Sequence, residues 1–137
     1  MNKLKYIPED LVYVPKFSNS IYKVISCGTY PYEVRDMNDN DAITEEPSIV
    51  PIPLTFEILE KNGWKLLIHH ERDSYYDVSW SSYHKPAETN ISLIFYPEEE
   101  AFFPFLYAQE ISEKPIMYVH QLQHLLFGLG LDSNLKI

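Results

Sequence analysis

Hydrophobic residues in the first third of the chain fall into short runs that are separated by turn residues. Three of these runs, residues 11–15, 20–27 and 32–35, are rich in β-branched and aromatic residues, which is typical of β-strands. A fourth short strand is expected at residues 42–44. Strands this short and this closely joined predict a small curled sheet, which we interpret as an SH3-like β lobe.

A proline-rich connector follows the lobe and leads into a short helix. Proline holds the residue before it out of the helical region, so Pro47, Pro51 and Pro53 predict an extended segment. Thr55 then stands where a side-chain oxygen can accept a hydrogen bond from the first helical turn. We expect a helix over residues 56–62.

Both ends of this helix carry strong local signals. Gly63 occupies the position of a left-handed C-terminal cap, and Trp64 follows it. Leu54 and Leu59 have the spacing of a hydrophobic staple across the N-terminus. A helix this short is marginal alone, so we expect Leu59 to fasten both ends and the helix to act as a fixed joint.

The next pattern predicts four antiparallel strands in sequence order. A strand that ends at His70 turns and returns through Trp80. Residues 91–97 are nearly all apolar and read as a central strand. Residues 101–107 return, and Pro104 predicts a position at the sheet edge because proline cannot donate to the ladder.

Residues 116–131 carry a helical stripe. The apolar residues recur at steps of one, four, seven, eight and eleven, which is one face of a helix. They are Tyr118, Val119, Leu122, Leu125, Leu126 and Leu129. Gly128 and Gly130 are stop signals, and we expect the helix to cover one face of the four-strand meander.

These elements predict an α+β fold. Residues 1–53 would form the small β lobe with an acidic loop and the proline-rich connector. Residues 54–137 would form a helix-meander-helix unit, and the two parts would together make one compact unit. A chain of 137 residues is long enough to bury a core of its own.

The net charge limits the classes of partner that the chain is expected to bind. The chain carries 11 basic and 20 acidic residues, for a formal charge of −9. This balance argues against binding to a nucleic-acid backbone or to an anionic membrane, which both need clustered Lys and Arg. A single cysteine, Cys27, cannot form an internal disulfide and fits a reducing compartment. No apolar run is long enough to span a membrane or to form a signal peptide.

Two surfaces are candidates for binding a protein partner. Residues 33–46 hold six acids against one arginine, a net charge of −5, which fits a solvated loop or a docking loop for a basic partner. A predicted hairpin tip adds aromatic residues that suit a contact surface. The residues of the two surfaces are Glu33, Asp36, Asp39, Asp41, Glu45 and Glu46, and Tyr75, Tyr76, Trp80 and Tyr83.

The hairpin also offers an alternative, a pocket for a small, nucleotide-like ligand. Imidazoles, a carboxylate and phenol rings occur close together around it and could serve proton transfer or ring stacking. The candidate residues are His69, His70, Tyr75, Tyr76, Asp77 and His84. The same residues also make an ordinary polar hairpin, and nothing in the pattern specifies a nucleophile.

The stretch HQLQH contains His120 and His124 at i and i+4 on the last predicted helix. Two histidines at this spacing can share one metal ion, as in the HExxH zinc proteases. Gln121 stands where those enzymes have the general-base glutamate, and an amide cannot accept a proton from a zinc-bound water. We interpret the pair as structural or surface histidines, and a non-catalytic metal site is the lesser alternative. For the whole chain we expect no cofactor and no enzymatic activity.

Residues 51–65 and 118–135 resemble blocks of small uncharacterised proteins that are encoded by Bacteroidetes phages, prophages and mobile elements. In that family a Pro-Leu-Thr helix start ends in a Gly-aromatic pair, and a Tyr-Val-His-Gln-Leu-Gln helix closes the chain. The matching positions are Pro53, Leu54, Thr55, Gly63 and Trp64, and residues 118–123. The family commonly has Asn where this chain has His124, which weakens the metal interpretation.

The resemblance implies an accessory protein in the cytoplasm of a bacterial host, and the family supplies no catalytic residues. We expect a non-enzymatic protein that binds a host or phage protein, one version being an antagonist of host defence. The small-ligand pocket and a minor virion component are the alternatives.

Overall fold

The computed structural model describes residues 5–26, 31–73, 78–85, 90–107, 109–112 and 114–137. The chain divides into two compact units. The first contains residues 1–53 and 118–134, and the second contains residues 54–117 and 135–137. The fold is α+β, with two antiparallel sheets and two α-helices among the described residues.

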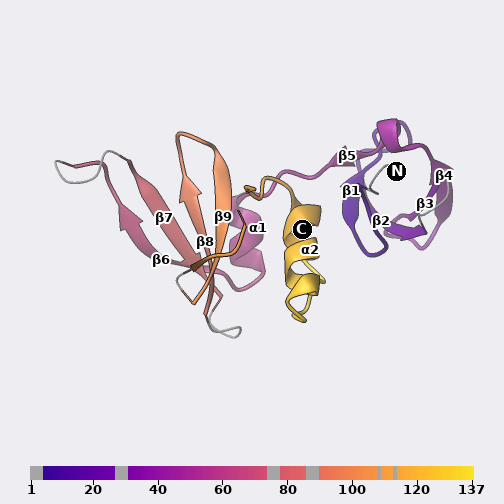
Figure 1. Ribbon diagram of the computed structural model, residues 1–137. Coiled ribbons are helices and arrows are strands. Elements are labelled where there is room, and N and C mark those ends of the chain that lie inside the picture. Colours follow the sequence, from indigo (N-terminus) through magenta and orange to yellow (C-terminus); the bar gives the residue numbers. More distant parts are fainter. Residues whose placement is uncertain (1–4, 27–30, 74–77, 86–89, 108, 113) are drawn as a thin grey trace. The chain divides into compact units, whose positions relative to one another are not determined.

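The first unit is built on a five-stranded antiparallel sheet in the order β4-β3-β2-β1-β5. The strands are β1 (Leu11–Tyr13), β2 (Ile21–Ser26), β3 (Tyr32–Arg35), β4 (Asp41–Thr44) and β5 (Val50–Pro51). A 3-10 helix, η1 (Glu46–Ser48), immediately precedes β5. In Figure 1 these strands curve around a common centre.

Alternation along these strands creates the core of the first unit. Successive strand residues point to opposite faces, so every second residue of β2 and β3 is buried. The core cluster consists of Tyr6, Val12, Val14, Tyr22, Val24, Tyr32, Val34 and Ile49.

The last helix, α2 (Val119–Gly128), belongs to the first unit, and this corrects the expectation that it covers the meander. The Val119 N–H bonds to the Ile52 carbonyl at 2.8 Å, which ties the start of the helix to the end of the front sheet. Leu122 and Leu126 are buried as the stripe predicts. An apolar stripe indicates which face of a helix is buried but not which sheet buries it.

The second unit consists of α1 (Phe56–Lys61) and a five-stranded antiparallel meander in the order β10-β9-β8-β7-β6. The strands are β6 (Lys65–His70), β7 (Trp80–His84), β8 (Ile91–Tyr96), β9 (Ala101–Leu106) and β10 (Gln109–Glu110). The expected meander has four strands, and the two-residue β10 is the addition. The returning strand begins at Trp80 rather than passing through it.

Pro104 does not put β9 at the sheet edge, because β10 lies beyond it. β10 pairs with Leu106 and Phe105. The Ile111 N–H then donates to the Pro104 carbonyl at 3.1 Å. Proline needs only to accept here, so the missing N–H costs the ladder nothing at this position.

The ends of α1 follow the local sequence. Thr55 accepts a hydrogen bond from a backbone N–H of the first turn at 3.2 Å, which confirms the predicted N-cap. Gly63 has a φ of 86°, which confirms the left-handed cap. The Trp64 N–H bonds back to the carbonyl of Leu59 at 3.0 Å, and both side chains are buried.

Within the described residues, no helix has the length and apolar character needed to cross a membrane.

Candidate functional site

The acidic segment of the first unit is a β-hairpin between β3 and β4. Asp36 organises its turn, because one carboxylate oxygen accepts from the backbone N–H groups of Asn38 and Asn40 at 2.8 and 2.9 Å. The bond from Asn40 is the main cause that lowers the pKa of Asp36. Asp39 has a φ of 62°, a left-handed conformation that aspartate adopts more readily than most residues. The segment is therefore an ordered turn rather than an open loop.

The base of the hairpin is closed by an ion pair. Arg35 Nε lies 2.7 Å from Asp41 Oδ1, and its Nη2 lies 3.3 Å from the other carboxylate oxygen. The guanidinium lowers the pKa of Asp41, and the carboxylate raises the pKa of Arg35. Both groups are solvent-exposed, so the pair contributes little to stability. Together with the turn, it ties two of the six carboxylates to the hairpin.

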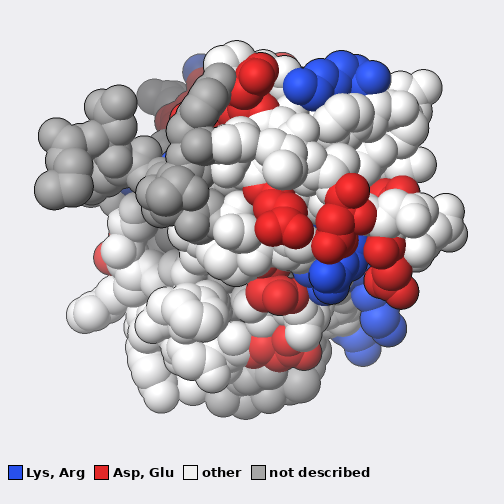
Figure 2. Space-filling view, turned by 90° about the vertical axis from the view of Figure 1, so that its right-hand side faces the viewer, with Lys and Arg blue, Asp and Glu red and all other residues white. Residues whose placement is uncertain are grey.

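Two large apolar side chains stand among these carboxylates. Met37 is 75% exposed and Ile43 is 65% exposed. Ile43 lies opposite Glu33 on the edge strand of the sheet. Figure 2 looks from the side of Figure 1 on which β4 lies, and it shows acidic side chains beside uncharged surface. Asp39, Glu45 and Glu46 are exposed, whereas Glu33 and Asp36 are half-buried.

The residues of the expected aromatic surface do not form one continuous surface in the structure. Tyr75, Tyr76 and Asp77 lie outside the described residues. Trp80 is half-buried and stacks on His70, with ring centroids 5.5 Å apart. Tyr83 is only 6% exposed and stacks on Phe56 of α1 at 5.3 Å, so it is a core residue and not a partner contact. Trp80 and Tyr83 are three residues apart on β7 and therefore point to opposite faces of the sheet.

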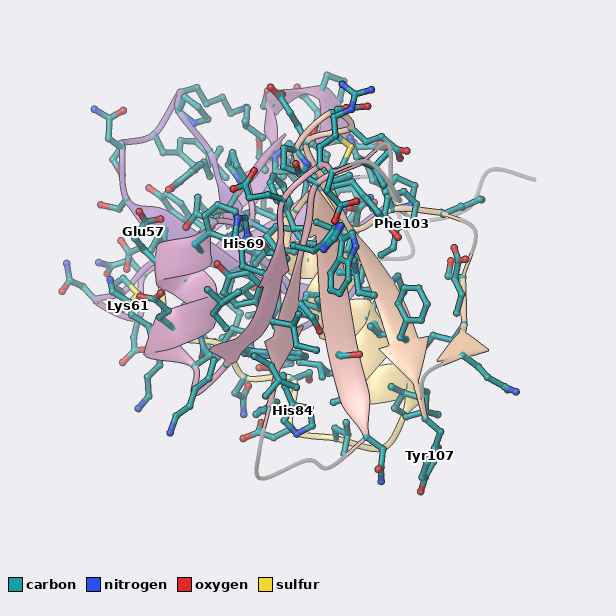
Figure 3. All side chains as sticks on the ribbon, turned by 90° about the vertical axis from the view of Figure 1, so that its left-hand side faces the viewer. Glu57, Lys61, His69, His84, Phe103 and Tyr107 are labelled. Carbon is teal, nitrogen blue, oxygen red and sulfur yellow. The ribbon has the colours of Figure 1, made fainter. Side chains whose placement is uncertain are left out.

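The histidines expected to line a ligand pocket do not converge. His69 and His70 are neighbours on β6 and point to opposite faces of the sheet. His84 pairs with Lys65 at the far end of the two strands, whereas His70 pairs with Trp80. Figure 3 shows His69 and His84 well apart along the sheet.

His69 instead takes part in a hydrogen-bonded chain on the sheet. Its Nδ1 lies 2.7 Å from Ser81 Oγ, and its Nε2 lies 2.6 Å from Glu71 Oε1. The bond from the imidazole lowers the pKa of Glu71. In the Ser-His-Asp triad the serine bonds to Nε2 and the acid to Nδ1, so this chain has the reverse orientation. Glu71 is exposed, and the chain cross-links β6 to β7 on the sheet surface.

The polar residues of the HQLQH stretch have structural partners. The Gln121 side chain accepts from the Tyr118 N–H at 3.1 Å, which is half of a capping box. The Gln123 amide accepts from the Leu11 N–H and donates to the Glu9 carbonyl, both at 2.9 Å. Gln121 thus serves the start of α2 at the position where a zinc protease has its base.

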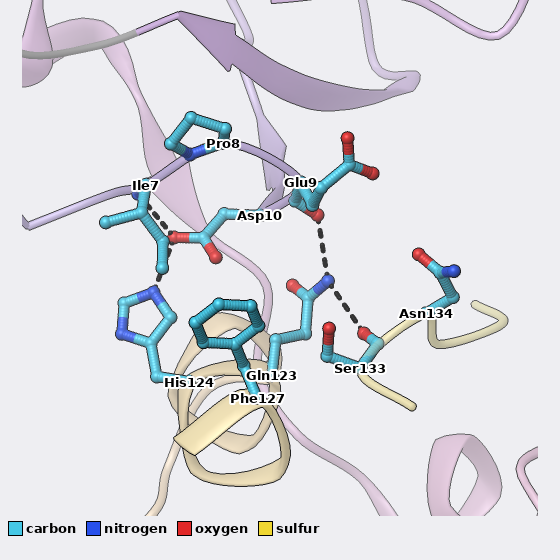
Figure 4. Close-up of a pocket in the computed structure, with 9 residues that line it drawn as sticks. All are labelled: Ile7, Pro8, Glu9, Asp10, Gln123, His124, Phe127, Ser133 and Asn134. Carbon is cyan, nitrogen blue, oxygen red and sulfur yellow. Dashed lines mark hydrogen bonds and ion pairs between the residues drawn. The ribbon is translucent and has the colours of Figure 1, made fainter. Parts of the chain in front are cut away.

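His124 forms a hydrogen bond with a buried carboxyl group. Its Nε2 lies 2.7 Å from Asp10 Oδ2, and Asp10 is 1% exposed. The same oxygen accepts from the Ile7 N–H at 2.9 Å. The pair borders a pocket of about 470 Å³, which Gln123, Phe127 and others also line (Figure 4).

His120 is buried beside aromatic rings. Its ring lies 5.0 Å from that of Tyr6 and 5.5 Å from that of His124. Burial lowers the pKa of His120 to about 4 and raises the pKa of Tyr6 to about 12. Among the residues that the structure describes, His120 Nδ1 and the Tyr6 hydroxyl are buried without a hydrogen-bond partner.

These contacts leave few ligand atoms available for a metal ion at the His120–His124 pair. One imidazole is already bonded to Asp10, and the other is buried. Among the residues that the structure describes, no group of three His, Cys, Asp or Glu side chains could hold a metal ion.

Sequence reasoning missed most of the residues that line the two pockets, although it named His124 and Thr55 for other roles. Asp10 and Gln123 reach their partners across more than a hundred residues, so no local pattern connects them. Phe56, Phe95 and Phe102 gather beside α1 and border a second pocket. Each of these phenylalanines reads as ordinary core in a sequence of this composition. Strand register pairs Phe95 with Phe102, and the placement of α1 brings Phe56 to them.

Comparisons with family models, curated proteins and solved structures found no match to this chain.

Proposed function

We propose that this chain is a non-enzymatic protein that binds a basic protein partner through the β3–β4 hairpin. The observation that carries the proposal is the exposure of Met37 and Ile43 among carboxylates. Apolar side chains supply contact area, and carboxylates select a basic partner and steer its approach. The exposed acids that we assign to this role are Asp39 in the hairpin turn and Glu45 and Glu46 directly after β4. Asp36 and Asp41 are already bonded within the hairpin.

A charge-removal experiment tests this role. We would capture partners from host cells with the intact protein and measure the affinity of each at increasing salt. The variant Asp39→Asn/Glu45→Gln/Glu46→Gln should bind about tenfold more weakly, because three attractive charges are lost. Higher salt should also weaken binding.

The control variant is Glu60→Gln/Glu98→Gln/Glu99→Gln, which removes the same charge from the second unit. Its affinity should equal that of the original protein. A partner whose binding ignores salt and both variants would contradict the proposal.

The proposed origin is a phage or mobile element of Bacteroidetes, and the proposed place of action is the cytoplasm of the bacterial host. The order and spacing of the two sequence blocks support this. The partner would be a host or phage protein, with antagonism of host defence as one version. Location of the gene among early accessory genes would support the proposal, whereas location among virion genes would favour a minor virion component.

For the front sheet we propose an SH3-like barrel. Support comes from the pairing of β1 with both β2 and β5 and from the 3-10 helix directly before β5. An experimental structure in which β4 and β5 diverge as the two edges of a flat sheet would contradict it.

A small-ligand role is the second candidate, and the pocket beside Asp10 and His124 favours it. The volume of about 470 Å³ is within the range of ligand pockets. A thermal-shift screen that includes nucleotides would test this role. Any shift should be lost in Phe127→Ala, because Phe127 is 70% exposed at the pocket and not part of the core.

A further inference from the structure

A second pocket, of about 400 Å³, lies in the second unit where the start of α1 meets β8 and β9. Its walls are aromatic and its rim is acidic. Phe56, Phe95 and Phe102 supply the rings, and Glu57 and Glu100 supply the carboxylates.

The three rings form a compact aromatic group. The Phe56 ring stands edge-on to Phe95 at 4.9 Å and 84°, and edge-on to Phe102 at 5.7 Å and 74°. Phe95 and Phe102 are 4.9 Å apart and tilted by 46°. Phe102 is buried, but Phe56 remains 36% exposed at the mouth. The geometry therefore leaves part of an aromatic surface open to a ligand.

The two carboxylates come from different elements. Glu57 is in the first turn of α1, and Lys61 lies one turn further along the helix (Figure 3). Glu100 ends the turn between β8 and β9 with a φ of 52°, and its N–H bonds to the Tyr96 carbonyl at 2.9 Å. Both glutamates are exposed, and within the described part of the chain neither forms an ion pair with Lys or Arg.

We propose that this pocket binds an organic monocation with an apolar stem, an alkylammonium or alkylguanidinium group such as a Lys or Arg side chain carries. Ring faces attract cations through their quadrupole, and the apolar walls cover the methylene stem. Two carboxylates at the rim favour a cation and repel an anion of similar size. The site is separate from the β3–β4 hairpin, so its failure would leave the proposed partner binding untouched.

Matched small molecules test the charge preference on the intact protein. We would titrate n-butylammonium, n-butylguanidinium, n-butanol and butyrate, and follow the aromatic signals of Phe56 and Phe95 by NMR. The cations should saturate with dissociation constants on the order of millimolar. Butanol should bind about tenfold more weakly, and butyrate more weakly still. Equal binding of butanol and the cations, or the absence of saturable shifts, would overturn the proposal.

Variants then test the residues. Glu57→Gln and Glu100→Gln should each weaken cation binding about threefold to tenfold while butanol binding is unchanged. Both side chains are exposed, so the fold should persist. Glu60→Gln is the control, because it removes the same charge from the same helix outside the pocket. Unchanged cation affinity in the double variant Glu57→Gln/Glu100→Gln would overturn the proposal.

A last titration distinguishes the source of the cation. Capped arginine and capped lysine carry the same group on a peptide backbone. Tighter binding of a capped amino acid than of the matching butyl compound would identify a protein side chain as the ligand. The opposite order would identify a free amine or guanidine.

Discussion

Leu59 connects the two ends of α1, the shorter of the two α-helices that the structure describes. Its N–H bonds to the Thr55 carbonyl at 3.1 Å, and its carbonyl accepts the Trp64 N–H at 3.0 Å. Its side chain is 0% exposed. A two-turn helix gains little from its own hydrogen bonds, so the burial of this one side chain carries much of its stability.

Replacement of Leu59 by alanine should lower the free energy of unfolding by about 2–5 kcal/mol, because a fully buried leucine is deleted and a cavity remains. Urea denaturation followed by tryptophan fluorescence measures the change. Glu60→Ala, at the exposed neighbouring position, is the control and should change stability by less than about 0.5 kcal/mol. A similar small effect for Leu59→Ala would show that the residue does not support α1.

His120 should make stability depend on pH. Its pKa falls from 6.5 to about 4 on folding because of burial. Between these values the unfolded chain binds a proton at this site and the folded chain does not. Its contribution is therefore complete above about pH 6.5 and is lost as the pH falls toward 4, by about 3 kcal/mol at most.

The measurement is the free energy of unfolding from pH 7 to pH 4.5 for the original protein and for His120→Leu. The variant should show a shallower fall, since Asp10, His124 and Lys5 remain and their contributions cancel in the comparison. Parallel curves, or an NMR titration of His120 near pH 6.5, would contradict the assignment.

At the scale of elements, α2 is held by hydrogen bonds as well as by its apolar stripe. Gln123 is 3% exposed. Its amide bonds to the Glu9 carbonyl and the Leu11 N–H, as a neighbouring strand would. The buried face of α2 therefore includes His120 and Gln123 beside Val119 and the leucines.

Gln123→Leu keeps the volume but removes three part-buried hydrogen bonds, from the Leu11 N–H and to the carbonyls of Glu9 and Ser133. A buried group left unpaired costs about 1–3 kcal/mol, and because these partners keep some access to water we expect a total loss of about 2–4 kcal/mol in unfolding free energy. Gln121→Ala is the comparison, because it removes only the side-chain half of the cap and should cost about 1 kcal/mol. Thermal denaturation followed by circular dichroism distinguishes the two. Equal losses would mean that the bonds of Gln123 contribute nothing beyond those of a cap.

Elements with local signals could be predicted from the sequence, and elements defined by distant partners could not. Thr55 and Gly63 mark α1 because caps depend on neighbouring residues. β10 could not be predicted, because a two-residue strand is too short to show a pattern of its own. The bond between His124 and Asp10 could not be predicted either, since 114 positions separate the two residues. The acidic character of residues 33–46 could be read from the sequence, but the pattern predicts a solvated loop rather than a hairpin turn. The aromatic pocket depends on the strand register of Phe95 and Phe102 and on the position of Phe56 in α1.

Each of the two units is assembled from two stretches of the chain. The meander and α1 come from a single stretch of chain, whereas the front sheet takes α2 from beyond the meander. Leu122 and Leu93 are both fully buried, at 1% and 0% exposure, in the first and second units respectively.

In native-state hydrogen exchange, a core substitution in one unit should therefore lower amide protection mainly in that unit. Leu122→Ala should lower the protection of amides in β1 to β3 by about 2–5 kcal/mol and should affect β7 to β9 much less. Leu93→Ala should do the reverse. Equal loss of protection in both sheets from either variant would show that the units unfold together.

The interrupted first unit has a consequence for synthesis on the ribosome. The front strands leave the exit tunnel before the meander and α2. The Leu11 N–H, however, bonds to the side chain of Gln123, which is synthesised 112 residues later. The meander lies between these two residues in the sequence. Synthesis proceeds at several residues per second, so the meander can complete its sheet before Gln123 emerges. During translation the front strands therefore stay exposed for longer than the strands of the meander. A chaperone that binds during synthesis should be found on the front strands, and release should coincide with the emergence of α2.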